Sequence, residues 1–313
     1  MVKKKVKELY IRAPWGNIAL IQWGNPNNTP MLLVHGYMDT AATFTLLVDQ
    51  LPDKHYYVGF DMPGHGKSDP FPQGILVTQL HIVEVIRRVV EHMKWKKFTF
   101  MSHSMGCIIG LFYHHIHPDY IEKMIFFDPI LPLAMYYVAD KKQPLWFLAV
   151  YSDYYDNFQK WNSGKPRLHT YDSAISLLVR NRSLTEEQAE VLLSRSLVPM
   201  GIDSYKLSWE PRMKKIAQLP IPEETLYTIM TEKFPPTLSV DASESHGDTT
   251  SKKFADNLLT KCEQTLPYFY RVTVTGGHDV HITNPELIVP HVNKFLNNDE
   301  KHFSRFFKKK CKL

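Results

Sequence analysis

The chain has 313 residues, of which 44% are hydrophobic and 22% charged, an ordinary composition for a globular protein with one substantial core. It contains no apolar stretch of transmembrane length and no apolar segment after its lysine-rich start, so we expect neither a membrane span nor a secretory signal. The formal net charge is +5, but the basic residues gather in the two tails and residues 8–300 are net acidic, which argues against a nucleic-acid-binding face.

The first half of the chain predicts a mostly parallel sheet. Residues 8–25 are typical of an antiparallel pair of strands, and residues 30–130 then alternate strand-like and helix-like segments. The apolar run Met31-Leu32-Leu33-Val34 suits a strand that is buried on both faces. It ends at His35-Gly36-Tyr37, where Gly36 allows a close backbone approach to a ligand and the Tyr37 N–H is a candidate oxyanion donor.

The loop Asp61–Asp69 is rich in proline and glycine and follows another strand-like run, so we interpret it as scaffold. His65 stands between two glycines in this loop, and we expect it to be a structural hydrogen-bond partner. The segment from Thr78 to His92 has apolar residues at helical spacing.

The most informative motif is Ser102-His103-Ser104-Met105-Gly106, which joins a strand-like run to a helix-like run. A serine on so sharp a turn, with small residues two places before and after it, is typical of a nucleophile elbow. The motif predicts Ser104 as the nucleophile and the Met105 N–H as a second oxyanion donor. Ser102 stands where glycine is usual, a small and sterically plausible departure.

Residues 133–219 change in character. They are rich in aromatic residues and in helix-like segments, with a capped helix start at Ser183-Leu184-Thr185-Glu186-Glu187. We interpret this segment as a helical cap inserted into the core, whose aromatic residues form its own interior and line an apolar acyl pocket.

The order of His35-Gly36, the 61–69 loop, Ser102–Gly106 and Gly276-Gly277-His278 resembles the α/β-hydrolase superfamily. The stretches from His35 to Phe44 and from Gly277 to Pro285 resemble the serine hydrolase-like proteins of animals, including insects. The resemblance covers roughly residues 8–135 and 220–298, and it implies the α/β-hydrolase fold. The predicted domains are therefore a core of residues 8–132 and 220–298, a helical cap of residues 133–219 and a basic tail of residues 299–313.

The resemblance also implies a catalytic base, because serine is a poor nucleophile unless a histidine takes its proton. His278 follows the strand-like run Tyr270–Val274 and a Gly-Gly turn, where the superfamily places its base. His281 is the competitor.

The carboxylate that orients the base remains open between several residues. Register against the family pattern, after the strand expected at Pro236–Val240, puts Glu244 at the acid position, with Asp241 and Asp248 as rivals. A different branch of the fold uses the preceding strand, and there Asp128 is the alternative.

The three cysteines are widely spaced and predict no disulfide framework, and no residue pattern calls for a metal or cofactor. The last residues, Cys311-Lys312-Leu313, resemble a peroxisomal address, which predicts a peroxisomal import receptor as a partner and otherwise a cytoplasmic location.

Together these observations predict a serine hydrolase of carboxylesterase type that acts on a small, apolar acyl substrate through an acyl-enzyme. A thioesterase or amidase with the same triad, or a non-catalytic ligand-binding protein of the same fold, are the alternatives. An epoxide hydrolase or haloalkane dehalogenase is disfavoured, because those carry aspartate where Ser104 stands. The oligomeric state does not follow from the sequence.

Overall fold

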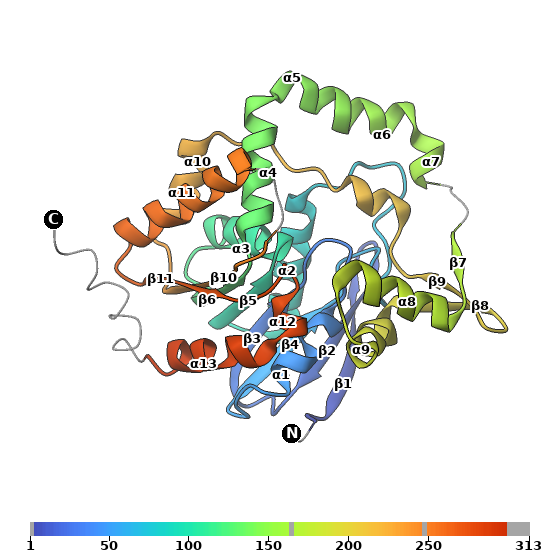
Figure 1. Cartoon of the computed structure of the whole chain (residues 1–313), viewed down its shortest axis with the longest axis horizontal. Helices are drawn as coiled ribbons and strands as arrows, with labels where there is room; N and C mark the ends of the chain where they lie inside the picture. The colour runs from blue at the N-terminus through green and yellow to red at the C-terminus, as the bar shows by residue number, and fades with distance from the viewer. Residues whose placement is uncertain (1–2, 163–165, 246–248, 299–313) are drawn as a thin grey trace.

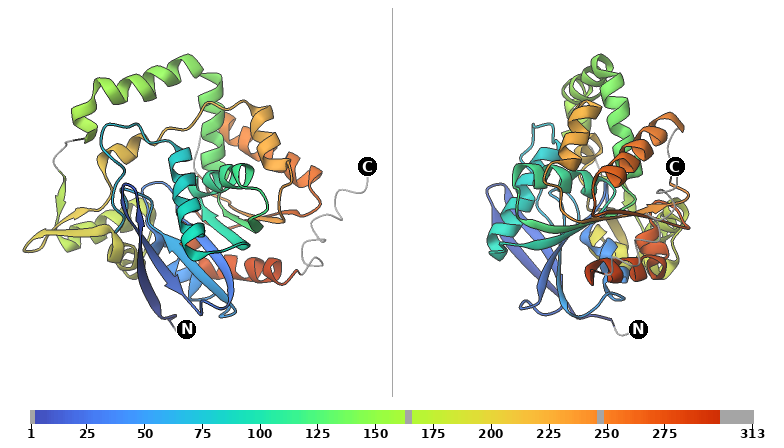
Figure 2. Two further views of the ribbon diagram at one scale, coloured as in Figure 1. Left: turned by 180° about the vertical axis from the view of Figure 1, so that it is seen from behind. Right: turned by 90° about the vertical axis from the view of Figure 1, so that its left-hand side faces the viewer.

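A twisted sheet with helices on both faces forms the body of the protein (Figures 1 and 2). The computed structural model describes residues 3–162, 166–245 and 249–298. Its eight strands stand in the order β1-β2-β4-β3-β5-β6-β10-β11. Their bounds are β1 (Val6–Ala13), β2 (Gly16–Trp23), β3 (Thr29–Val34), β4 (His55–Phe60), β5 (Phe98–His103), β6 (Ile121–Phe127), β10 (Thr237–Ala242) and β11 (Phe269–Val274).

The pairing confirms the predicted mostly parallel sheet. Strand β2 pairs antiparallel with β1 and β4, and the other neighbours are parallel. Strand β5 and residues Met31–Val34 of β3 are buried because both faces of these central strands carry helices, which explains the unbroken apolar run of β3. Val34 pairs with Ser102, and His103 pairs with Phe127, so the carboxyl ends of β3, β5 and β6 lie side by side. Ligands bind at this edge in open α/β sheets.

Two hydrophobic cores fill the space between the sheet and its helices. Helices α2, α3, α4, α10 and α11 contribute to one core, and η1, α1, α12 and α13 to the other. Apart from α4, their bounds are η1 (Ala41–Phe44), α1 (Thr45–Val48), α2 (Gln79–Met93), α3 (Met105–Ile116), α10 (Glu223–Thr231), α11 (Thr249–Thr265), α12 (Val280–Thr283) and α13 (Pro285–Leu296).

The segment between β6 and α10 is an insertion that extends over the carboxyl edge of the sheet (Figure 1). It is not purely helical, because β7, β9 and β8 form a small antiparallel sheet. The predicted boundary at residue 133 falls inside helix α4, which begins at Ile130. The elements are α4 (Ile130–Lys141), α5 (Gln143–Trp146), the π-helix η2 (Phe147–Ser152), α6 (Asp153–Asp156), α7 (Phe158–Asn162), β7 (Leu168–His169), α8 (Tyr171–Arg182), α9 (Glu186–Ser196), β8 (Leu197–Gly201), β9 (Ser204–Leu207) and the 3-10 helix η3 (Pro211–Lys215).

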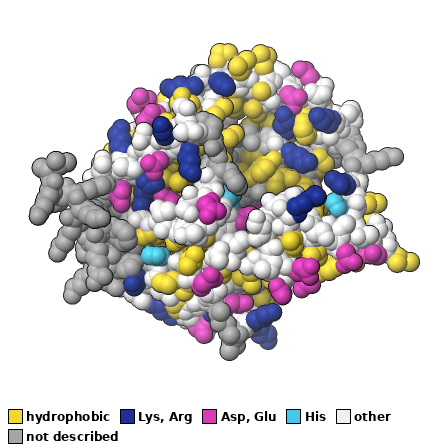
Figure 3. Space-filling view, in the orientation of Figure 1, with side chains coloured by type: hydrophobic (Ala, Val, Ile, Leu, Met, Phe, Trp, Pro, Cys, Tyr) yellow, Lys and Arg dark blue, Asp and Glu magenta, His cyan; other side chains and the backbone are white. Residues whose placement is uncertain are grey.

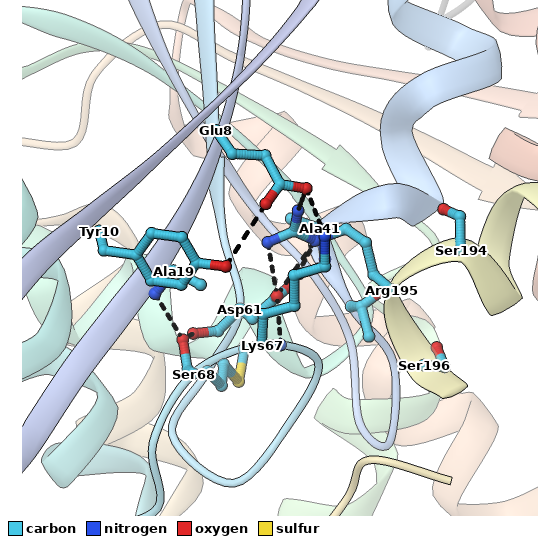
Figure 4. Close-up of polar contacts among 12 residues, drawn as sticks. Glu8, Tyr10, Ala19, Ala41, Asp61, Lys67, Ser68, Ser194, Arg195 and Ser196 are labelled. Atoms are coloured by element: carbon cyan, nitrogen blue, oxygen red, sulfur yellow. Dashed lines mark hydrogen bonds and ion pairs between the residues drawn. The ribbon is translucent and has the colours of Figure 1, made fainter. Parts of the chain in front are cut away.

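The side chain of Arg195 joins the insertion to the core (Figure 4). It extends from α9 to the buried carboxylate of Asp61, 2.7 Å away, and to Glu8 of β1, 3.0 Å away. Asp61 also accepts hydrogen bonds from the backbone N–H groups of Ala41 and Lys67. The 61–69 loop thus has the scaffold role that its composition suggests, and α9 is fastened to the body by a buried ion pair.

Among the described residues, none of the helices combines the length and the hydrophobicity needed to cross a bilayer. The basic tail and Cys311-Lys312-Leu313 lie outside the described residues, so the peroxisomal address and its receptor stay a prediction.

Candidate active site

Ser104 lies on the turn between β5 and α3, with φ of 52° and ψ of −123°. Such a backbone conformation is strained for a serine and is typical of functional sites. The turn is so close to β3 that a Cβ atom at Gly106 would lie 2.3 Å from the Val34 carbonyl oxygen. Glycine is therefore required at position 106, whereas the small, fully buried Ser102 fits at the other side of the turn.

His278 is brought to Ser104 by the loop that follows β11. Its Nε2 atom lies 2.9 Å from the Ser104 hydroxyl oxygen. The competitor His281 is buried against the ring of His103, and its Nε2 atom lies 2.8 Å from the Thr43 hydroxyl and not at Ser104. Of the two histidines, His278 alone has the geometry of a base for Ser104.

Asp128, at the end of β6, contacts the other side of the His278 ring. Its Oδ2 atom lies 2.5 Å from His278 Nδ1. The carboxylate is fully buried and also accepts hydrogen bonds from the Ser245 hydroxyl at 2.6 Å and the Ala242 N–H at 3.3 Å. An Nδ1–H that donates to Asp128 leaves the Nε2 lone pair directed at Ser104.

The preferred acid, Glu244, does not agree with this geometry, and the alternative Asp128 takes its place. Glu244 is exposed, and its backbone N–H donates to the Gly276 carbonyl. Asp241 is buried in an ion pair with Arg271, and Asp248 lies outside the described residues. The physical reason is that β6 and β10 are adjacent and parallel, so both strand ends approach the same histidine.

The two predicted oxyanion donors flank Ser104. Met105 is the first residue of α3, so its N–H has no acceptor one turn earlier in the helix. The Tyr37 loop packs against the elbow, because a Cβ atom at Gly36 would lie 3.0 Å from the Ser104 Cβ. His35 holds this loop: its Nε2 accepts the Met62 N–H at 2.9 Å, and its Nδ1–H therefore donates to the Gly36 carbonyl at 2.8 Å.

A layer of histidines behind His278 was not predicted. The ring of His103 lies 4.6 Å from that of His278 and 4.0 Å from that of His281, measured between centroids. His103 Nε2 donates to the His278 carbonyl at 3.0 Å. Burial lowers the pKa of His103 and of His281 well below the ordinary value, so both rings are neutral near pH 7. The position of His103 inside the elbow motif was the available signal.

Arg182 of α8 fixes the two loops on either side of this layer. Its guanidinium lies 2.9 Å from Asp39 and 2.6 Å from Asp279, the residue that follows His278. Burial would raise the pKa of Asp39, but the charge of Arg182 outweighs it and the pKa falls to about 2. Asp39, His103 and His281 have metal-ligand atoms within 4.8 Å of one another, but the adjacent Arg182 cation opposes a metal ion there.

A cavity of 590 Å³ opens beside Ser104. Ser104, Met105 and Tyr37 form part of its wall, and apolar side chains of α4, α5 and η2 form much of the rest. In the space-filling view, hydrophobic side chains gather in a hollow below the helical arm that contains α5 and α6 (Figure 3). The wall is suited to an apolar chain, with a few polar groups close to the serine.

Comparisons with known proteins agree with this architecture. The sequence profile of the alpha/beta hydrolase fold family matches residues 29–285. The chain is 28% identical to the zebrafish "Serine hydrolase-like protein", over 94% of this chain and 90% of that protein. It is 26% identical to the Drosophila melanogaster "Probable serine hydrolase", over 93% and 87% of the two chains.

Solved structures show the same fold at low sequence identity. A thioesterase domain from the curacin biosynthetic pathway superposes with a TM-score of 0.72 at 18% identity, covering 92% of this chain and 99% of that domain. The hypothetical protein PA1622 from Pseudomonas aeruginosa, in its selenomethionine form, gives 0.72 at 20% identity over 93% and 99% of the two chains. The chain therefore belongs to the α/β-hydrolase family and is similar along most of its length to animal serine hydrolase-like proteins.

Proposed function

We propose that the protein is a serine hydrolase that cleaves a carboxylic ester through an acyl-enzyme, with Ser104, His278 and Asp128 as its triad. The observation that carries the proposal is the continuous chain of contacts from Asp128 through His278 to Ser104, at the wall of an apolar cavity. The nucleophile, the base and the orienting carboxylate each have the partner that this chemistry needs.

In the first half of the reaction, Ser104 Oγ attacks the ester carbonyl while His278 Nε2 takes the serine proton. The N–H groups of Tyr37 and Met105 donate to the oxyanion that forms, and Asp128 stabilises the charged imidazole. When the C–O bond breaks, His278 returns the proton to the leaving alcohol. Water then attacks the acyl-enzyme with His278 again as the base, and this step releases the acid and restores Ser104.

The same residues would act on a thioester or an amide, because only the leaving group differs. A non-catalytic binding protein would keep the fold and the cavity without an activated serine. The strained Ser104 backbone and its contact with His278 favour the enzyme.

Labelling of the purified protein with a fluorophosphonate probe tests the proposal. We expect the wild type to be labelled at Ser104, the Ser104→Ala variant not at all, and the His278→Ala variant far more slowly. The variants are compared by circular dichroism, so that a loss of labelling is not a loss of fold. A folded wild type that resists labelling would favour the binding protein, and turnover of matched esters, thioesters and amides would separate the enzyme classes.

A further inference from the structure

Lysine side chains interrupt the apolar wall of the cavity. Lys142 follows α4, and Lys214 and Lys215 lie at the end of η3. No aspartate or glutamate is among the described residues that line the cavity. Since residues 8–300 are net acidic, these lysines are not part of a generally basic surface. Lys and Arg side chains also border the hollow in Figure 3.

The three lysines differ in whether their charge is already neutralised. Lys215 is engaged, because its Nζ lies 2.5 Å from Asp153 and 4.9 Å from the centre of the Trp161 ring. No carboxylate in the described ranges lies within ion-pairing distance of Lys142 or Lys214. The cavity wall therefore carries two solvent-exposed lysines, Lys142 and Lys214, that have no carboxylate partner among the described residues, so their charges are free to attract an anion that enters the cavity.

Lys214 is held close to the reacting groups. The Tyr37 hydroxyl donates to its backbone carbonyl at 3.2 Å, so the residue lies beside the loop that supplies one oxyanion donor. A further hydrogen-bond donor lies in the wall. Gln79 is 1% exposed, its Oε1 accepts from the Tyr136 hydroxyl, and its Nε2 has no partner among the described residues. Cations and an unused amide donor are the groups that an anionic or acceptor-rich ligand needs.

From these observations we infer that the substrate joins an apolar acyl chain to an anionic group, a phosphate or a carboxylate, which Lys142 and Lys214 bind. The inference rests on the proposed function and deepens it by naming the substrate class. The acyl chain lies against Leu131, Met135 and Val138 of α4, and the negative charge lies near the lysines. The anion belongs either to the leaving group or to the far end of the acyl chain.

Two pairs of substrates distinguish these sources, because the members of each pair differ in charge and share a reacting bond. The p-nitrophenyl ester of octanoic acid is compared with the mono-p-nitrophenyl ester of octanedioic acid, which adds a carboxylate to the acyl chain. S-octanoyl-N-acetylcysteamine is compared with octanoyl-coenzyme A, which adds phosphates to the leaving thiol. The readout is the ratio of kcat/KM for the charged member to that for the neutral member.

We expect at least one ratio to exceed about tenfold at low salt, and to fall several-fold at about 0.5 M salt. The double variant Lys142→Gln/Lys214→Gln should bring that ratio close to one. The control Lys96→Gln removes an exposed lysine between α2 and β5 that does not line the cavity, and it should keep the wild-type ratio.

Wild-type ratios near one in both pairs would overturn the inference, as would a high ratio that survives the loss of both lysines. Both outcomes require that the wild type hydrolyses the substrates. If the proposed function itself is wrong, the wild type hydrolyses none of the four substrates. In that case, calorimetric binding of octanoyl-coenzyme A to the Ser104→Ala protein still decides about the anion site. Tight binding that is lost when Lys142 and Lys214 are replaced supports the anion site. An affinity that does not change when both lysines are replaced refutes it.

Discussion

Asp128 is held in place by more than its contact with His278. Ser245 and the Ala242 N–H direct its carboxylate toward the imidazole, and burial excludes water that would compete. We expect Asp128→Asn to lower kcat for a p-nitrophenyl ester by roughly three to four orders of magnitude, because an amide no longer stabilises the productive tautomer or the charged imidazole.

The matched control for this prediction is Glu244→Gln, which changes the exposed carboxylate nearby. Its kcat should stay within about twofold of the wild type, because exposed surface substitutions have small effects. The assignment of the acid would be reversed if Glu244→Gln were the damaging substitution and Asp128→Asn the harmless one. Steady-state kinetics of both purified variants measure the difference directly.

The substitution Gly106→Ala tests whether the close contact between the Ser104 turn and β3 positions the nucleophile. In Gly106→Ala, the new Cβ would press on the Val34 carbonyl, so β3 and the elbow must move apart. We expect a loss of about 1–3 kcal/mol in the free energy of unfolding. A fall of roughly 100-fold in kcat should accompany it, since small displacements of the nucleophile are costly.

Gly201→Ala in the β8–β9 hairpin is the control for Gly106→Ala. A Cβ there meets only the Ser204 Cβ, at an ordinary 3.7 Å. Urea denaturation and ester hydrolysis should find it close to the wild type. Equal effects of the two substitutions would mean that contact with β3 does not position Ser104.

At this scale the sequence predicted the residues whose local motifs are rigid. The five residues around Ser104 and the Gly-Gly-His turn are short motifs whose backbone conformation depends on the local sequence. Ser104 and His278 could therefore be proposed as nucleophile and base from the sequence. The carboxylate that orients His278 could not be identified from the sequence, because Asp128 and Glu244 both follow strands that end beside His278. Which of the two contacts the imidazole depends on the path of the loop after each strand. The stacking of His103 on His278 and His281 was not predicted, because contacts between residues distant in the chain leave no pattern in the sequence.

Among the elements, α9 depends on a buried charge pair. Arg195 and Asp61 are 3% and 0% exposed, and each is the main counter-ion of the other. Arg195→Met leaves the Asp61 carboxylate buried without a cation, so we expect a loss of about 3–5 kcal/mol in the free energy of unfolding. Adding Asp61→Asn to this variant should recover part of the loss.

Arg180→Met on the exposed face of α8 is the control for the Arg195 prediction, and it should change stability by less than about 0.5 kcal/mol. Chemical denaturation of the three variants beside the wild type gives the comparison. A double variant less stable than Arg195→Met alone would show that the ion pair is not what fastens α9.

The sequence also predicted the core elements better than the insertion. Long apolar runs and helical periods gave the core strands and α2, because burial on one or both faces imposes those patterns. Strand β7 has two residues, and β8 contains Pro199 and Gly201, which disfavour strands. Their pairing arises from tertiary contacts, so the sequence predicts only helices where the structure has both helices and a small sheet.

Considered as a whole, the described part of the molecule buries six histidines, and burial lowers the pKa of His55 and His114 as well as that of the four discussed next. Burial lowers the pKa of His35, His103 and His281, and that of His65 falls to about 3. In the unfolded chain these residues titrate near about 6.5, so as pH falls below this value the unfolded state binds protons that the folded state does not. The free energy of unfolding therefore has its full value above this pH. As the pH falls below it, each of these histidines lowers the free energy of unfolding by about 1.4 kcal/mol for each pH unit.

We expect urea midpoints to fall steeply between about pH 7.5 and 5.5, by more than carboxylates can explain, because those titrate at lower pH. His65→Asn should flatten this dependence, whereas His92→Gln, which changes an exposed histidine, should leave it as steep as in the wild type. Equal midpoints at both pH values would contradict the burial of neutral imidazoles as a source of stability.

All three residues of the proposed triad lie in connections that follow core strands, and none belongs to the segment between Ile130 and Lys215 that forms much of the cavity wall. The proposed catalytic residues and much of the surface that contacts the substrate are thus encoded by separate stretches of the chain. Substitutions in the Ile130–Lys215 segment can therefore change the cavity wall and leave the triad unchanged. A substrate established for one relative should therefore be transferred to another only where their inserted segments, and not merely their serine motifs, are alike.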